Sequence, residues 1–83
     1  MATVYILYSE MLDRYYIGHT TMSAEERLIK HLANHQGFTG HAKDWIIVYK
    51  EYFDDKSEAL KRELYIKNKK SRKFIENLIP KKE

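Results

Sequence analysis

Tyrosine, arginine and histidine side chains recur at short intervals in the first part of this 83-residue chain. Tyr5 and Tyr16 each lie in an apolar, aromatic segment typical of a β-strand. Arg27 and His31 are four residues apart, so they would share one face of a helix. A guanidinium can stabilise a phosphate, and an imidazole can move a proton near neutral pH. Such a set can cleave phosphodiesters, although tyrosines in strands are more commonly core or interface residues.

Local signals predict the elements that must position these groups. Strand signatures cover residues 4–8, 14–18 and 45–53. Capping signals that start helices occur at Ser23, Asp55 and Ser71. The order ββαβαα predicts an α+β fold, with a small three-stranded antiparallel sheet flanked by helices. We expect a single domain over residues 1–83, with a frayed tail from about residue 80.

The predicted second helix carries an acid among apolar residues. Its expected apolar stripe consists of Ala59, Leu60, Leu64 and Ile66. Glu63 stands beside that stripe, where a purely solvated carboxylate does not belong. One interpretation is an ion pair with Lys67 or Arg62, and the other is a ligand for a cation.

Charge is distributed unevenly along the chain. Residues 56–82 contain ten Lys or Arg against three Glu, whereas residues 1–55 contain five Lys or Arg against eight acids. A basic C-terminal third suits a polyanionic partner such as nucleic acid, with salt-dependent binding. The plainer alternative is a set of lysine-rich, solvated helices.

Composition also excludes some classes of protein. The chain has no cysteine, so it has neither disulfides nor thiolate metal sites. Its apolar runs are too short for a membrane span, and its start lacks the features of a signal peptide. We therefore expect a cytoplasmic protein with no membrane partner.

Two short motifs resemble those of the GIY-YIG nuclease family. The first reads Thr3-Val4-Tyr5, with Thr3 at the place of a glycine, and the second, Tyr16-Ile17-Gly18, is intact. The resemblance extends over almost the whole chain. It implies that Tyr5, Tyr16, Arg27 and His31 are catalytic, with Gly18 as a structural part of the motif. It also implies that Glu63 is the only protein ligand of Mg²⁺ (or Mn²⁺), an ion that keeps most of its waters.

The resemblance implies a metal-dependent endonuclease that hydrolyses phosphodiester bonds in DNA, with a role in DNA repair or processing. No groove-reading element is evident, so we expect structure-selective or weakly sequence-selective cleavage. An RNA substrate, and a homodimer or protein partner that supplies specificity, remain open. Two alternatives are a non-catalytic nucleic-acid-binding module on the same fold and a protein-interaction domain.

Several further residues are candidates for secondary roles. Those that could contact nucleic acid are His19, Lys43, Lys69, Lys70 and Lys73. Asn68 and Asn77 both suit the late asparagine that the family uses, and their spacing does not choose between them. His31 and His35 have the spacing of a helical zinc pair, but no third ligand accompanies them.

Overall fold

The computed structural model describes residues 1–33 and 42–80. Within these ranges the chain forms three strands and three helices: β1 (Ala2–Ser9), β2 (Arg14–Thr20), α1 (Ala24–Ala33), β3 (Ile46–Phe53), α2 (Lys56–Lys69) and α3 (Arg72–Leu78). The predicted α+β class and the order ββαβαα are confirmed. The tail residues 81–83, for which we expected fraying, lie outside the described ranges.

The three strands form one antiparallel sheet in the order β2-β1-β3. The central position of β1 explains why it is almost entirely buried, with alternate side chains entering two different cores. Tyr5 pairs with Gly18 on β2 and with Lys50 on β3. This register places the two family motifs side by side at the edge of the sheet formed by β2.

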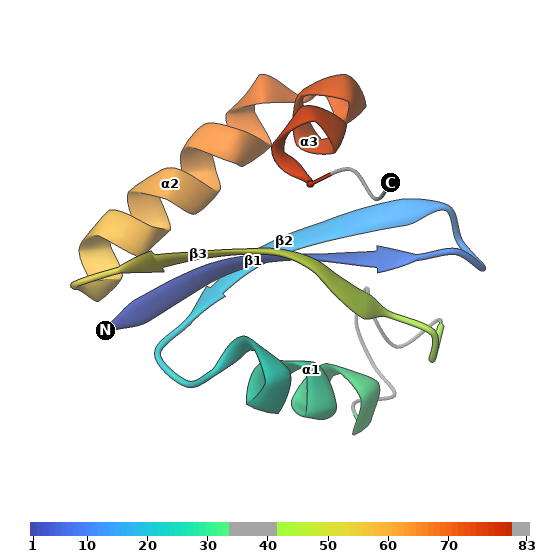
Figure 1. Ribbon diagram of the computed structural model, residues 1–83, viewed down its shortest axis with the longest axis horizontal. Helices are drawn as coiled ribbons and strands as arrows, with labels where there is room; N and C mark the ends of the chain where they lie inside the picture. The colour runs from blue at the N-terminus through green and yellow to red at the C-terminus, as the bar shows by residue number, and fades with distance from the viewer. Residues whose placement is uncertain (34–41, 81–83) are drawn as a thin grey trace.

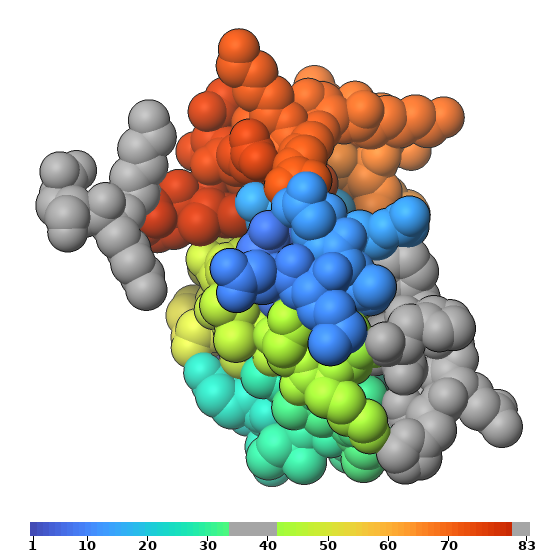
Figure 2. All heavy atoms as spheres, turned by 90° about the vertical axis from the view of Figure 1, so that its right-hand side faces the viewer, coloured from blue at the N-terminus to red at the C-terminus, as the bar shows by residue number. Residues whose placement is uncertain are grey.

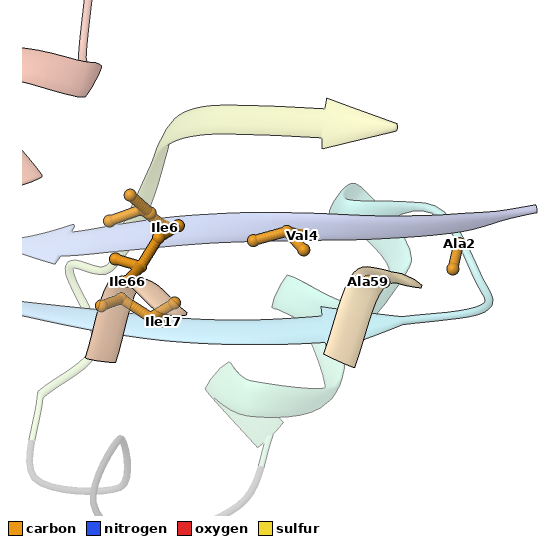
Figure 3. Packing of buried hydrophobic residues seen from close by; sticks show 6 residues of the cluster. All are labelled: Ala2, Val4, Ile6, Ile17, Ala59 and Ile66. Carbon is orange, nitrogen blue, oxygen red and sulfur yellow. The ribbon is translucent and has the colours of Figure 1, made fainter. Parts of the chain in front are cut away.

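Helices cover both faces of this sheet, with α2 and α3 on one side and α1 on the other (Figure 1). On the α2 side, Ile66 packs with Ile6 and Ile17, and Ala59 packs near the start of β1 (Figure 3). On the α1 side, Tyr5 and Leu7 pack against the apolar residues of α1 and against Trp45, which is 2% exposed. The β1–β2 hairpin projects between the C-terminal helices and the α1 layer (Figure 2).

The expected caps begin all three helices. Ser23 and Glu26 form a reciprocal capping box, in which each side chain accepts a hydrogen bond from the other residue's backbone N–H. Asp55 accepts from the N–H of Glu58, and Ser71 accepts from that of Phe74. Such caps each stabilise a helix by roughly 1 kcal/mol. The predicted helix starts are therefore confirmed.

The predicted apolar stripe of α2 is wrong in half of its members. Leu60 and Leu64 are 41% and 47% exposed, and the residues that α2 buries are Ala59, Glu63 and Ile66. Positions 59, 63 and 66 follow the helical repeat and lie against the sheet. The carboxylate therefore lies within the buried face instead of beside it.

Two boundaries differ slightly from expectation. Strand β3 begins at Ile46, one residue after the predicted start at Trp45, whose buried side chain precedes the strand. In residues 1–33 and 42–80, no helix combines the length and the apolar character that crossing a membrane requires.

Candidate active site

A hydrogen bond joins the first tyrosine to the histidine of α1. The Tyr5 hydroxyl lies 2.8 Å from His31 Nε2, and both side chains are buried. Burial raises the pKa of Tyr5 above its ordinary value, an effect that the nearby Arg27 guanidinium partly opposes. Burial and the same guanidinium lower the pKa of His31. At neutral pH the pair is therefore a phenol and a neutral imidazole.

The second tyrosine completes an aromatic cluster. The Tyr16 ring lies 4.9 Å from the His31 ring and 6.4 Å from the Tyr5 ring. Gly18 makes this packing feasible, because a Cβ atom there would stand 2.7 Å from the Tyr5 hydroxyl oxygen and 3.2 Å from Tyr16 Cε2. The end of the Tyr5 ring thus crosses the backbone of β2 at Gly18. This crossing carries the Tyr5 hydroxyl from the central strand towards the edge of the sheet.

Arg27 lies one turn before His31 on α1 and close enough to act on both pKa values. Its Nε atom is buried and has no hydrogen-bond partner among the described residues. A buried N–H donor without an acceptor is costly, and more so when it belongs to a charged group. The arrangement suits an anionic oxygen that arrives with a ligand.

On the opposite face of the sheet, Glu63 is held by two donors. Its Oε1 atom lies 2.5 Å from His19 Nδ1, and its Oε2 atom lies 2.5 Å from Lys67 Nζ. Burial alone would raise the pKa of Glu63, but these two hydrogen bonds outweigh it and lower the pKa. The side chain is 10% exposed, so Glu63 is a nearly buried carboxylate that stays ionised.

The two groups of side chains meet around strand β2. His19 pairs with Val4 and shares the α2 face, whereas Tyr16 pairs with Leu7 and shares the α1 face. Because β2 is an edge strand of the described sheet, both groups can reach the same strip of surface. The charge of Glu63 contributes to the raised pKa of Tyr5 across this edge, which places the two halves within electrostatic range.

The donor set around Glu63 fits a hard cation only with help from a substrate. No cluster of three or more acidic or histidine side chains capable of holding a metal occurs in residues 1–33 and 42–80. Each oxygen of Glu63 has one hydrogen-bond donor, which leaves lone pairs for a metal. Magnesium is commonly held by one or two carboxylates with waters and substrate phosphates. Glu63 fits that role, with the Lys67 ammonium as a competitor for Oε2.

The other sequence-predicted residues are spread more widely. Lys70 lies near this edge, because it lines a groove with Tyr16 and Lys67. The Lys69 ammonium instead lies 4.5 Å from the centre of the Tyr65 ring. Lys43, Lys73, Asn68 and Asn77 are exposed. Lys43 donates to the Leu32 carbonyl at the end of α1, at 3.3 Å. His35 lies outside the described residues.

Sequence reasoning placed His19 among nucleic-acid contacts and missed its hydrogen bond to Glu63. The two residues are 44 positions apart, and no local spacing connects them. The two interpretations of Glu63 were also only partly separable. Lys67 does form the expected ion pair, whereas Arg62 pairs with Glu51 at 2.8 Å. The only usable signal for His19 was its place directly after the Tyr-Ile-Gly motif, on the same strand.

Comparison with known proteins agrees with this geometry. The family model described as "GIY-YIG catalytic domain" matches residues 1–77. No curated protein and no solved structure matches the chain significantly. The matched range contains both tyrosine motifs, Arg27, His31 and Glu63. The chain therefore belongs to the GIY-YIG catalytic domain family, a family of nucleases.

Proposed function

We propose that this protein is a metal-dependent endonuclease that hydrolyses phosphodiester bonds in DNA, with structure-selective or weakly sequence-selective cleavage. The observation that carries the proposal is the unpartnered, buried Nε of Arg27 beside the Tyr5–His31 hydrogen bond. An anion acceptor is needed next to a pair that can take up a proton. A scissile phosphate and its attacking water supply both needs.

Tyr5 and His31 act as a proton relay in this proposal. With the imidazole proton on Nδ1, Nε2 accepts from the Tyr5 hydroxyl. The oxygen of Tyr5 can then accept a proton from water while its own proton passes to His31. The raised pKa of Tyr5 disfavours a standing phenolate, so His31 is the final proton acceptor. Tyr16 packs against His31 and orients it.

Phosphoryl transfer then follows with balanced charge and atoms. The water oxygen attacks phosphorus, the bond to the leaving oxygen breaks, and the proton of the water resides on His31. Arg27 donates to the phosphate oxygen on which negative charge grows. Glu63 would hold a divalent ion that, when bound, polarises the phosphate and stabilises the leaving oxygen. His19 holds the Glu63 carboxylate in position.

The direct test uses labelled linear, nicked and branched DNA, incubated with Mg²⁺ or Mn²⁺ or with a chelator. Wild-type protein should cleave at least one substrate only when metal is present. Glu63→Gln, which keeps the shape and removes the charge, should abolish cleavage while leaving the melting temperature similar. Arg27→Ala should lower turnover roughly 10²–10³-fold, the loss expected for one preorganised donor. Lys30→Ala, an exposed cation on the same helix, is the matched control.

The rival function is nucleic-acid binding without cleavage. It predicts salt-dependent binding by both wild-type and Glu63→Gln proteins, with no metal-dependent products from any substrate. A folded Glu63→Gln protein that cleaves as fast as wild type would contradict the metal assignment. RNA of the same structures is included in the panel, because none of the side chains described here distinguishes a 2′-hydroxyl.

A further inference from the structure

A groove of about 390 Å³ lies along strand β2, beneath the turn that joins α2 to α3. Its volume is within the range of small-molecule binding sites. We call it the β2 groove, and its argument rests on six lining residues: Tyr15, Tyr16, Ile66, Lys67, Lys70 and Ile75. Isoleucines supply apolar walls, tyrosines supply aromatic surface, and lysines bring positive charge.

One end of the β2 groove coincides with the candidate active site. Tyr16 belongs to the aromatic cluster around His31, and Lys67 contacts the Glu63 carboxylate. A molecule in the groove would thus lie next to a phosphate that Arg27 and Glu63 engage. The groove is on the α2 side of the edge strand, so a substrate strand can enter it by passing around β2.

The hollow continues away from the active site. A second depression of about 360 Å³ shares Tyr15, Lys70 and Ile75 with the β2 groove and extends to Arg14 and Arg72. Together the two depressions follow β2 towards the β1–β2 hairpin. Cationic residues therefore line a path that starts beside Glu63, which suits a polyanionic strand.

The aromatic surface at the centre of this path is held firmly. The Arg72 guanidinium carbon lies 5.3 Å from the centre of the Tyr15 ring, and Arg72 is itself fixed by Asp13 and Glu76 at 2.6 and 3.0 Å. The Tyr8 ring lies 4.8 Å from the Tyr15 ring. A fixed aromatic surface between cations is the combination that proteins use to bind unpaired nucleotides, with the base stacked and the phosphate neutralised.

We propose that the β2 groove binds one unstacked nucleotide of the substrate strand, directly beside the scissile phosphate. The base occupies the space between the tyrosines and isoleucines, and the phosphate on its outer side contacts Lys70. This inference rests on the proposed nuclease function and makes it more specific. Substrates with an unpaired nucleotide next to the cleaved bond are then preferred, because no base has to leave a stack.

An abasic scan tests the groove in the wild-type protein. The cleaved bond is first mapped with metal on a branched DNA that has a single-stranded arm. Affinity is then measured with chelator for a series in which one nucleotide at a time lacks its base. Removal of one base within two nucleotides of the cleaved bond should weaken binding about tenfold. Every other position should change affinity less than about twofold.

Crosslinking locates the sensitive base on the protein. A 5-iodouracil at the sensitive position should crosslink to Tyr15 or Tyr16 on irradiation, as mapped by mass spectrometry. Tyr65, exposed on α2 and absent from the groove lining, is the internal comparison. Lys70→Asn, a residue that tolerates the left-handed backbone of Lys70 (φ 49°), should weaken binding more than Lys69→Asn does.

The outcomes separate the two proposals. Metal-dependent cleavage with a flat abasic scan, or with crosslinks only at Tyr65, would overturn the groove assignment and leave the nuclease intact. Absence of metal-dependent cleavage would overturn both, because the place of the groove is defined by a scissile phosphate. Cleavage with one sensitive base that crosslinks to Tyr15 or Tyr16 supports both.

Discussion

The α1 side and the α2 side of the sheet present their reactive groups in different states. On the α1 side, Tyr5 and His31 are already hydrogen-bonded, and the buried Arg27 Nε has no acceptor among the described residues. On the α2 side, both oxygens of Glu63 are engaged, by His19 and by Lys67. The first half is thus prepared for a phosphate, whereas the second must exchange a protein cation for a metal.

This contrast gives the two halves different electrostatic tasks. An unpaired buried donor gains most when an anion arrives, so the α1 side favours the loaded state. A carboxylate that is neutralised by an ammonium is stable without metal, so the α2 side protects the empty state. Strand β2 separates the two tasks, and Gly18 allows Tyr5 to reach across it.

The largest expected effect breaks the α1 half. Tyr5→Phe removes the hydroxyl that connects water to His31 and keeps the ring in the core. We expect turnover to fall roughly 10²–10⁴-fold, the usual scale for lost acid–base help. DNA affinity without metal should hardly change, because no cation is lost. Single-turnover cleavage and fluorescence anisotropy measure the two quantities.

Tyr16→Phe sharpens the same comparison. If Tyr16 only orients His31 through its ring, this variant should lose less turnover than Tyr5→Phe. Tyr52→Phe, at a tyrosine that is 62% exposed, is the control for loss of a phenol hydroxyl. Full activity of Tyr5→Phe with an unchanged melting temperature would refute the relay.

A methyl group at Gly18 tests the crossing between the halves. In Gly18→Ala the new Cβ would lie 2.7 Å from the Tyr5 hydroxyl oxygen and 2.8 Å from Tyr5 Cζ, so the ring must move. Overpacking of this kind lowers the free energy of unfolding by about 1–3 kcal/mol. Turnover should fall as well, because the Tyr5–His31 hydrogen bond depends on the ring position.

A double variant separates packing from chemistry at this position. Gly18→Ala combined with Tyr5→Phe removes the shortest contact but keeps the contact at Cζ. It should recover part of the unfolding free energy, as measured in urea, and none of the activity. Thr21→Ala, at an exposed site after the strand, controls for a new alanine in this segment. Additive losses of stability in the double variant would show that the two side chains do not compete for space.

The sequence predicted the elements well because their signals are local. Ser23, Asp55 and Ser71 each satisfy backbone donors a few residues away, and Arg27 and His31 are linked by the helical repeat. The sequence could not choose between the two apolar stripes of α2, because residues 59, 63 and 66 and residues 60 and 64 both follow that repeat. Burial of the first stripe, including Glu63, depends on His19 and Lys67, which supply its carboxylate with donors. The His19–Glu63 contact needs the strand register and the docking of α2, which no short motif encodes.

A smaller effect is expected from releasing the α2 half. Lys67→Met removes the ammonium at Oε2 and keeps much of the side-chain volume, while His19 still holds Oε1. A hydrogen bond between charged groups contributes about 1.5–3 kcal/mol, so we expect Mn²⁺ to bind at least about tenfold more tightly. Electron paramagnetic resonance titration at pH 8 without DNA measures this binding directly. Lys69→Met, whose ammonium lies over Tyr65, is the matched control, and equal Mn²⁺ affinity in both variants would contradict competition by Lys67.

The smallest expected effect is the pH response of the α1 half. Burial and the Arg27 charge lower the pKa of His31 in the folded protein below its ordinary 6.5. The folded state therefore favours the neutral imidazole, and the unfolded chain takes up this proton first as the pH falls. The resulting stability is fully present above about pH 6.5 and is lost as the pH falls through the lower, folded value.

Two measurements check this sign. In a histidine NMR titration, His31 should titrate below 6.5 in the wild type and nearer to 6.5 in Arg27→Ala, because one of the two causes is removed. Between pH 7 and 5, the free energy of unfolding should fall less steeply for His31→Gln than for wild type. The carboxyl of Glu63 acts with the same sign, but below its ordinary value of 4.5, so it does not obscure this window. A His31 midpoint above 6.5 would mean that the histidine enters the reaction protonated, which would reverse the direction of the relay through Tyr5.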